Sequence, residues 1–118
     1  MIKSYRDLLV WQKSMDLVCE VYRLVKLLPK EEFYALSSQM RRSSVSIPSN
    51  IAEGQQRKTT KEFVNFLSIA RGSNAELYTQ LMICIRLDYL EEAEVKNAMQ
   101  YSDEIGKMIN SIIDKLSE

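Results

Sequence analysis

Apolar residues along the chain recur at alternating spacings of three and four, which is the period of an amphipathic helix. The pattern covers four segments, at residues 8–28, about 32–57, about 60–87 and about 91–116. No segment alternates strictly between apolar and polar residues as a strand does. The connections are short, so the 118 residues predict a single all-α domain, an antiparallel up-down-up-down four-helix bundle.

The same spacing predicts which face of each helix lies in the core. In the first helix the core residues are Leu8, Trp11, Met15, Val18, Tyr22 and Val25. In the second they are Leu36, Met40, Ile47 and Ile51. In the third they are Phe63, Leu67, Ala70, Leu77, Leu81 and Cys84, with Asn74 as a polar interruption. In the fourth they are Val95, Ala98, Ile105, Met108, Ile112 and Leu116.

Pro48 falls within the second helix, where it lacks the N–H that would bond the carbonyl of Ser44. We therefore expect this helix to be kinked at Pro48. Two short helices that meet at Pro48 are the alternative. Elsewhere, Pro29 ends the first helix, and the spacing of Thr59 and Glu62 predicts a capping box at the start of the third.

The first helix carries more apolar residues than a bundle needs. Of the 21 residues from Leu8 to Leu28, 14 are apolar, whereas a core-facing helix needs about nine. A helix that is apolar on two sides is either central or covered by another subunit, and a four-helix bundle has no central helix. We therefore predict self-association through the second apolar stripe, which consists of Val10, Leu17, Val21, Leu24 and Leu28.

The composition removes several enzyme classes from consideration. The chain has no histidine, which is the usual general base and the commonest zinc ligand. No Ser/Lys or Ser/His arrangement supports a nucleophile, and the three scattered glycines form no phosphate-binding loop. Cys19 and Cys84 lie far apart in apolar segments, which is typical of buried thiols in a reducing cytosol. We predict no enzymatic activity, no metal site and no cofactor.

The sequence pattern also predicts neither a membrane-spanning segment nor a secretory signal. No apolar run approaches the roughly 20 residues that span a bilayer. The N-terminal residues MIKSYRD carry charges and have no apolar segment behind them, so we expect no secretory signal. These features predict a cytoplasmic protein without a membrane partner.

Two segments rich in small and polar residues lie in the second and third helices, at 39–54 and 70–76. Antiparallel neighbours would bring them together, and small residues let helix backbones approach closely. We expect a structural polar network there, for example an Arg42–Glu76 pair, that fixes the register of the two helices. A ligand pocket between the helices is the alternative. The residues of the network are Arg42, Ser46, Asn50, Glu53, Ser73 and Glu76.

The formal net charge of zero conceals a strong segregation of charge. Residues 1–86 hold 13 basic and 8 acidic residues, a net of +5, whereas residues 87–118 hold 3 basic and 8 acidic residues, a net of −5. A basic helix–helix corner favours an anionic partner such as a phosphate backbone, and a solvated basic corner is the alternative. The candidate residues for RNA or DNA binding are Arg41, Arg42, Arg57, Lys58, Lys61 and Arg71.

Several strings in the sequence resemble a known family. They are DLLVWQ at 7–12, QMRRSSVSIPSNIAEG at 39–54, KEF at 61–63 and IARGSNAEL at 69–77. They are similar to the four-helix bundle proteins of the 23S rRNA intervening-sequence type, over nearly the whole chain. The resemblance places structural signature positions at Arg42, Ser46, Pro48, Asn50, Glu53, Gly54, Ala70, Gly72, Ser73 and Glu76.

The resemblance implies an up-down-up-down bundle that assembles as a homopentamer. A related protein is the accessory variability determinant of diversity-generating retroelements, a pentamer that binds nucleic acid and a reverse transcriptase. We therefore expect a homo-oligomeric binding or assembly module, with RNA or DNA, a reverse transcriptase or another protein as partner. The alternative is a protein-interaction scaffold that uses the acidic fourth helix or the oligomer surface, and a third is a small-molecule site in a central pore.

Overall fold

Four α-helices make up most of the structure, a computed structural model that describes residues 4–118. They are α1 (Leu9–Val25), α2 (Leu36–Gln55), α3 (Thr60–Arg86) and α4 (Glu92–Leu116). Two short 3-10 helices, Tyr5–Asp7 and Lys30–Glu32, precede α1 and α2. Among the described residues there is no strand, so the predicted all-α fold of four helices is confirmed. The expectation about an N-terminal signal rests partly on residues 1–3, which lie outside the described range.

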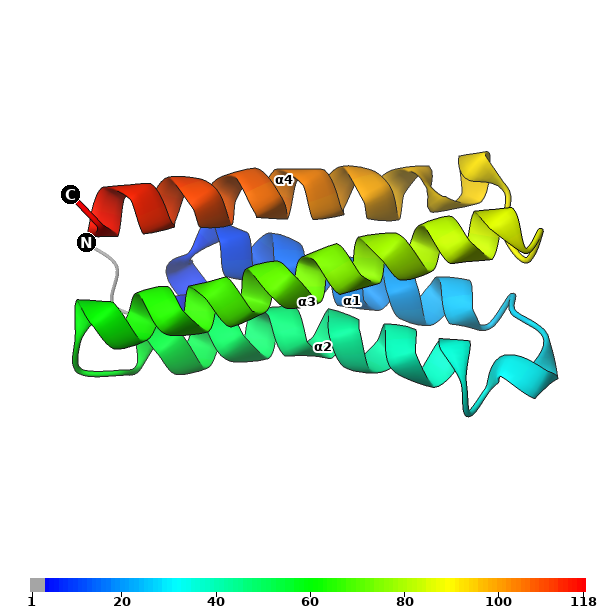
Figure 1. Cartoon of the computed structure of the whole chain (residues 1–118), viewed down its shortest axis with the longest axis horizontal. Coiled ribbons are helices and arrows are strands. Elements are labelled where there is room, and N and C mark those ends of the chain that lie inside the picture. Colours follow the sequence, from blue (N-terminus) through cyan, green and yellow to red (C-terminus); the bar gives the residue numbers. More distant parts are fainter. Residues whose placement is uncertain (1–3) are drawn as a thin grey trace.

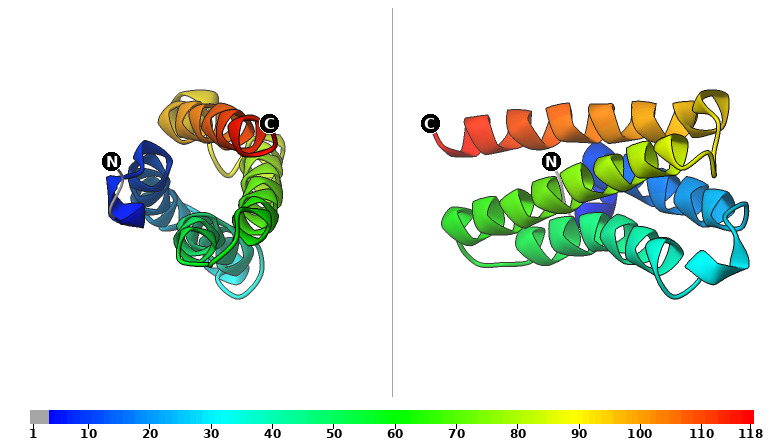
Figure 2. Two further views of the ribbon diagram at one scale, coloured as in Figure 1. Left: turned by 90° about the vertical axis from the view of Figure 1, so that its left-hand side faces the viewer. Right: turned by 45° about the vertical axis from the view of Figure 1, so that its right-hand side comes forward.

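The helices pack side by side in a bundle that is 44 Å long. Consecutive helices run in opposite directions along this axis (Figure 1). Seen from the end, they occupy the corners of a square in which α1 lies opposite α3 and α2 lies opposite α4 (Figure 2). Each helix contacts its two neighbours, and the contact between α2 and α3 is the most extensive. The seam between α1 and α2 is therefore on the opposite side of the bundle from the seam between α3 and α4.

All four helices contribute fully buried side chains to one core, among them Leu17, Ile47, Leu77 and Ile105. In α2, α3 and α4, most of the residues predicted for the core are fully buried. The exceptions are half-buried and lie mainly towards the ends of the stripes: Leu36, Phe63, Met108, Ile112 and Leu116. The 3.6-residue period therefore identified the core face of these three helices.

The predicted core face of α1 is wrong. Val10, Leu17, Val21, Leu24 and Leu28, which we had expected at a subunit interface, are buried in the chain's own core. They therefore cannot contact a second copy. On the other stripe Met15 and Tyr22 are exposed, whereas Leu8, Trp11, Val18 and Val25 are half-buried. Of these, Leu8, Trp11 and Val25 pack against the edge of the core.

A buried serine explains why the sequence favoured the wrong stripe of α1. Ser14 is fully buried between Val10 and Leu17, where it interrupts the apolar spacing of the true core face. Its hydroxyl donates a hydrogen bond to the carbonyl of Val10 at 2.7 Å, so the polar group is satisfied inside the core. The surplus of apolar residues on α1 is real, but it lies on the stripe that includes Trp11 and Met15.

The observed helix ends follow local hydrogen bonding. The backbone N–H of Glu62 donates to Thr59 Oγ1 at 3.1 Å, so the side-chain cap predicted for the third helix is present. α1 ends at Val25, earlier than predicted, because the last turn before Pro29 is tightened by bonds between residues three apart. The second helix begins at Leu36 rather than near residue 32, because a 3-10 helix occupies 30–32.

Pro48 is buried inside α2, which continues as one helix from Leu36 to Gln55. The alternative of two short helices meeting at Pro48 is therefore excluded, and the kink stays a prediction. A serine side chain near the proline bonds back to the helix, with Ser44 Oγ donating to the Arg41 carbonyl at 2.9 Å.

The two cysteines have different environments, because Cys84 is buried and Cys19 is exposed. The expectation that both thiols are buried is therefore wrong for Cys19. Within residues 4–118, no helix is both long enough and apolar enough to cross a bilayer.

Candidate functional site

The small residues of α2 and α3 form a hydrogen-bonded seam between the two helices. The hydroxyls of Ser46 and Ser73 lie 2.9 Å apart across the seam. The side-chain amide of Asn50 donates to Ser46 Oγ at 2.9 Å and to the Ser46 carbonyl at 2.7 Å. Three members of the predicted polar network are therefore in contact, and they connect α2 with α3.

The other three residues predicted for this network, Arg42, Glu53 and Glu76, are charged and lie outside the hydrogen bonds that join Ser46, Ser73 and Asn50. Arg42 and Glu76 are exposed and line one polar pocket of about 370 Å³, but their charged groups form no ion pair within 4.0 Å in the described residues. Glu53 is exposed and pairs instead with Arg57, at 2.7 Å. The expected Arg42–Glu76 pair is therefore wrong, and the hydrogen bonds that join Ser46, Ser73 and Asn50 involve uncharged side chains.

Two further buried polar pairs connect the helices, and the sequence analysis missed both. Ser43 Oγ donates to Gln80 Oε1 at 2.7 Å, between α2 and α3. The amide of Asn74 donates to the Ser102 carbonyl at 2.9 Å, and Ser102 Oγ donates back to Asn74 Oδ1 at 2.8 Å. The signal was present, because Ser102 lies on the core stripe of α4 and Asn74 interrupts the core stripe of α3.

Gly54 marks a close approach between α2 and α3. A Cβ at this position would lie 2.6 Å from Phe66 Cβ and 3.0 Å from Phe63 Cδ1. Carbon atoms in ordinary contact lie about 3.5–4.0 Å apart, so no larger residue fits without a shift. Gly72, the glycine of the matching segment on α3, has no such neighbour within 4 Å. The two signature glycines therefore differ in role.

The six candidate nucleic-acid residues do not form one patch. Arg41 and Arg57 are 16 residues apart on or next to α2, a distance of about 24 Å along the helix. Arg41 donates to the Phe33 carbonyl at 3.1 Å, and its guanidinium packs over the Phe33 ring. Arg71 donates to Asn110 on α4 at 3.0 Å. The structure therefore separates Arg41, Arg42 and Arg71 from the connection between α2 and α3.

The remaining three basic residues lie together at that connection. Arg57 is neutralised locally, because it pairs with Glu53 at 2.7 Å and lies 3.8 Å from Glu62. Lys58 and Lys61 are exposed, and neither has an ion-pair partner within the described part of the chain. At this connection the unpaired positive charge is thus that of these two lysines, beside the N-terminus of α3.

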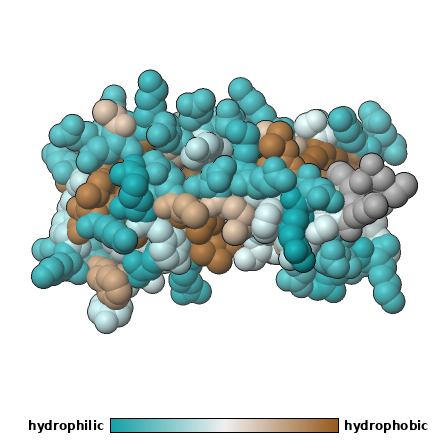
Figure 3. Space-filling view, turned by 180° about the vertical axis from the view of Figure 1, so that it is seen from behind, coloured by the Kyte–Doolittle hydropathy of each residue, from teal (hydrophilic) through white to brown (hydrophobic). Residues whose placement is uncertain are grey.

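An apolar surface extends along the seam between α1 and α2. Met15 is 41% exposed and Tyr22 is also 41% exposed. Trp11, Met15 and Val18 line a shallow groove of about 370 Å³ together with Val45 of α2. Seen from the side on which α1 lies, apolar patches follow the middle of the molecule between polar edges (Figure 3).

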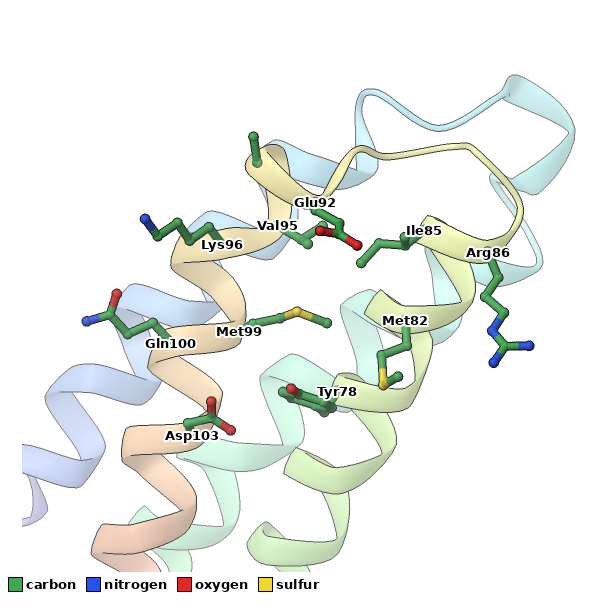
Figure 4. A pocket seen from close by; sticks show the side chains of 11 residues that line it. Tyr78, Met82, Ile85, Arg86, Glu92, Val95, Lys96, Met99, Gln100 and Asp103 are labelled. Carbon is green, nitrogen blue, oxygen red and sulfur yellow. The ribbon is translucent and has the colours of Figure 1, made fainter.

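A second apolar surface is the groove between α3 and α4, which has a volume of about 760 Å³. Tyr78 and Met82 form its α3 wall, and Met99 reaches across from α4 (Figure 4). Charged side chains border it, with Glu92 near one end and Asp103 near the other. Met82 is 47% exposed, so this groove is open to a partner.

Two titratable groups, Cys84 and Tyr89, have raised pKa values. Burial raises the pKa of the Cys84 thiol from 9.0 to about 11, so the thiol is protonated and unreactive at neutral pH. Tyr89 donates to Glu32 Oε2 at 2.7 Å, and this bond raises the pKa of Tyr89. Among residues 4–118, no three His, Cys, Asp or Glu side chains are placed to hold a metal ion.

The model of one protein family, described as 23S rRNA-intervening sequence protein, matches residues 6–111. The chain belongs to this family. A solved structure is also similar, that of a protein with unknown function from the S23 ribosomal protein family of Bacteroides thetaiotaomicron. It is 31% identical, the match covers 89% of this chain and 98% of that chain, and the TM-score is 0.83. A search of curated proteins found no match.

Proposed function

We propose that this family member is a non-enzymatic module that assembles with copies of itself, as a homopentamer, and contacts RNA or DNA. The observation that carries the assembly is exposed apolar surface on a bundle whose core is already complete. Met15 and Tyr22 on α1, and Met82 on α3, are each more than 40% exposed. Large apolar patches on a soluble domain are typical of surfaces that another protein covers.

Sedimentation velocity at micromolar concentration tests the assembly. The expected result is a single oligomeric species with a mass of five chains. A monomer at this concentration contradicts the proposal, because an interface that matters at cellular concentrations has at least micromolar affinity.

The nucleic-acid part of the proposal rests on Lys58 and Lys61. Both are exposed and unpaired, and both lie beside the N-terminus of α3, where the helix dipole also favours an anion. In a ring with parallel bundles, every copy presents this corner on the same side, so a single polyanion contacts several corners at once. Multivalency then strengthens a contact that is weak for one chain.

Fluorescence anisotropy with a labelled single-stranded RNA or DNA tests this part. If several corners together make about 6–10 phosphate contacts, affinity should fall by about 10³–10⁵-fold between about 50 and 200 mM salt. Lys58→Glu with Lys61→Glu should abolish binding, whereas Lys58→Arg with Lys61→Arg should retain it. The oligomer mass of all variants is the control. Equal affinity of the Glu and Arg variants contradicts a role for this corner.

A protein scaffold without nucleic-acid binding is the second candidate, and the charge of α4 favours it. Residues 87–118 carry a net charge of −5, and Glu92, Glu94 and Asp103 are exposed. A basic protein would bind such a surface with electrostatic steering. An oligomer that shows no RNA or DNA binding at about 50 mM salt supports this candidate instead.

A further inference from the structure

We propose that copies of this chain assemble head to tail, with the apolar α1–α2 face of one copy seated in the α3–α4 groove of the next. This inference rests on the proposed self-assembly and adds which two surfaces meet. The α1–α2 face consists of Trp11, Met15, Val18 and Tyr22 with Val45. In this arrangement, a second copy of the same chain occupies the α3–α4 groove.

The position of the two surfaces favours a contact between different faces. The α1–α2 seam and the α3–α4 seam lie on opposite sides of the bundle (Figure 2). Each copy thus has one of each surface free to meet a neighbour on either side. A contact between two different surfaces repeats from copy to copy, and it closes into a ring where the rotation between copies closes, as the proposed pentamer requires, whereas a self-complementary surface stops at a dimer.

The two surfaces also match in length and in kind. The exposed stripe of α1 runs from Trp11 to Tyr22, about 16 Å along the helix, and the α4 wall of the groove runs from Glu92 to Asp103, also about 16 Å. An amphipathic helix that lies in an apolar groove is a common mode of recognition. Met82 and Met99 have flexible side chains that can adapt to the aromatic rings of α1.

Charge specifies which surface is the partner. A pocket of about 500 Å³ at the end of α1 is lined by Lys26, Lys30 and Arg41, without an acidic side chain in its lining. The corresponding end of the α3–α4 pair carries exposed Asp88, Glu91 and Glu92, which outnumber Arg86 and Lys96 there. Both lie at the end of the bundle where α1 finishes and α4 begins (Figure 1).

These ends meet when the bundles stand parallel around a ring axis. The cationic pocket of one copy then faces the acidic end of the groove on the next. Two α1–α2 faces paired in parallel would instead place the cations of both copies against each other, which is unfavourable. The charges therefore favour a contact between unlike faces over a parallel contact between like faces.

Three single substitutions at residues of similar exposure test the inference. Met15→Glu changes only the α1–α2 face, and Met82→Glu changes only the groove. Ile83→Glu is the matched control, because Ile83 follows Met82 and is 40% exposed but does not line the groove. Native mass spectrometry should show monomers for the first two variants and the wild-type oligomer for the control. Circular dichroism should show that all three remain helical.

Mixing the two defective variants separates head-to-tail assembly from like-face pairing. A Met15→Glu copy retains its groove and a Met82→Glu copy retains its α1–α2 face, so a 1:1 mixture should give a heterodimer that grows no further. An oligomer that persists in Met82→Glu overturns the inference and leaves the proposed assembly intact. A wild-type monomer overturns both. A mixture of the two variants that stays monomeric also overturns the inference, because the single remaining pair of intact faces then fails to bind.

Discussion

Replacing Gly54 with alanine should destabilise the bundle relative to the same change at Gly72. Both glycines lie in helices and neither has a positive φ, so both gain helix propensity on substitution. They differ in their surroundings. A Cβ at Gly54 would lie 2.6 Å from Phe66 Cβ, whereas a Cβ at Gly72 would have no neighbour within 4 Å.

The expected magnitudes follow from these distances. Phe66 Cβ is bonded to the α3 backbone and cannot rotate away, so relief of the clash requires α2 and α3 to separate by about 1 Å. Overpacking of this kind costs about 1–3 kcal/mol. Alanine in place of glycine contributes about 0.5–1 kcal/mol in a helix interior, as at Gly72, and no more than this at Gly54, which lies in the last turn of α2. Gly54→Ala should therefore be less stable than Gly72→Ala by about 1–3 kcal/mol.

Urea and thermal denaturation followed by circular dichroism measure this difference. Protein concentration must be the same for all samples, because self-assembly shifts apparent stability. A difference of 1 kcal/mol corresponds to about 4 °C in Tm for a domain of this size. Gly106→Ala is an internal control, since its Cβ would lie 3.4 Å from Asn74 Nδ2, an ordinary contact. If Gly54→Ala is as stable as Gly72→Ala, Gly54 does not set the distance between the helices.

Three further predictions concern the core. Asn74→Ala should lower the free energy of unfolding by about 1–3 kcal/mol in urea titrations, because the Ser102 hydroxyl and the Ser102 carbonyl each lose a hydrogen bond to Asn74. Leu17→Ala should cost about 2–5 kcal/mol and Met15→Ala less than about 1 kcal/mol, and the reverse order would mean that α1 is turned the other way. With the exposed cysteine replaced by serine, Cys84 should react with a disulfide reagent at pH 9 only after unfolding. Because burial raises its pKa from 9.0 to about 11, its contribution to stability is present below pH 9 and is lost as the pH rises towards 11.

The sequence predicted the core faces of α2, α3 and α4 well because each of these helices has a single stripe with the 3.6-residue period. In α1 the same reasoning failed, since two stripes had the same period and only the packed neighbours could choose between them. Ser14 misled the choice, because a residue that is polar in the sequence is compatible with the core once its hydroxyl bonds to Val10.

The candidate sites were only partly predicted because the sequence does not give the distances between residues in the folded chain. Arg41 and Arg57 appear close in a list of basic residues, but a helix places them about 24 Å apart. Ser46 and Ser73 were predicted to meet because antiparallel neighbours align their small segments, and they do. The charged residues beside them diverged, since long side chains on a helix surface reach solvent or a residue one turn away, as Glu53 does with Arg57.

Side-chain size explains why the α2–α3 seam differs from the apolar surfaces of α1 and of the α3–α4 groove. Small residues let α2 and α3 approach so closely that Gly54 contacts the Phe66 region, and uncharged hydrogen bonds then fix their register. This seam is occupied by its own contacts and offers a partner little apolar area. α1 and the α3–α4 groove carry large exposed side chains instead. The apolar surplus of the sequence therefore lies where a neighbouring copy can reach it, and the polar signature motif stabilises the subunit that presents it.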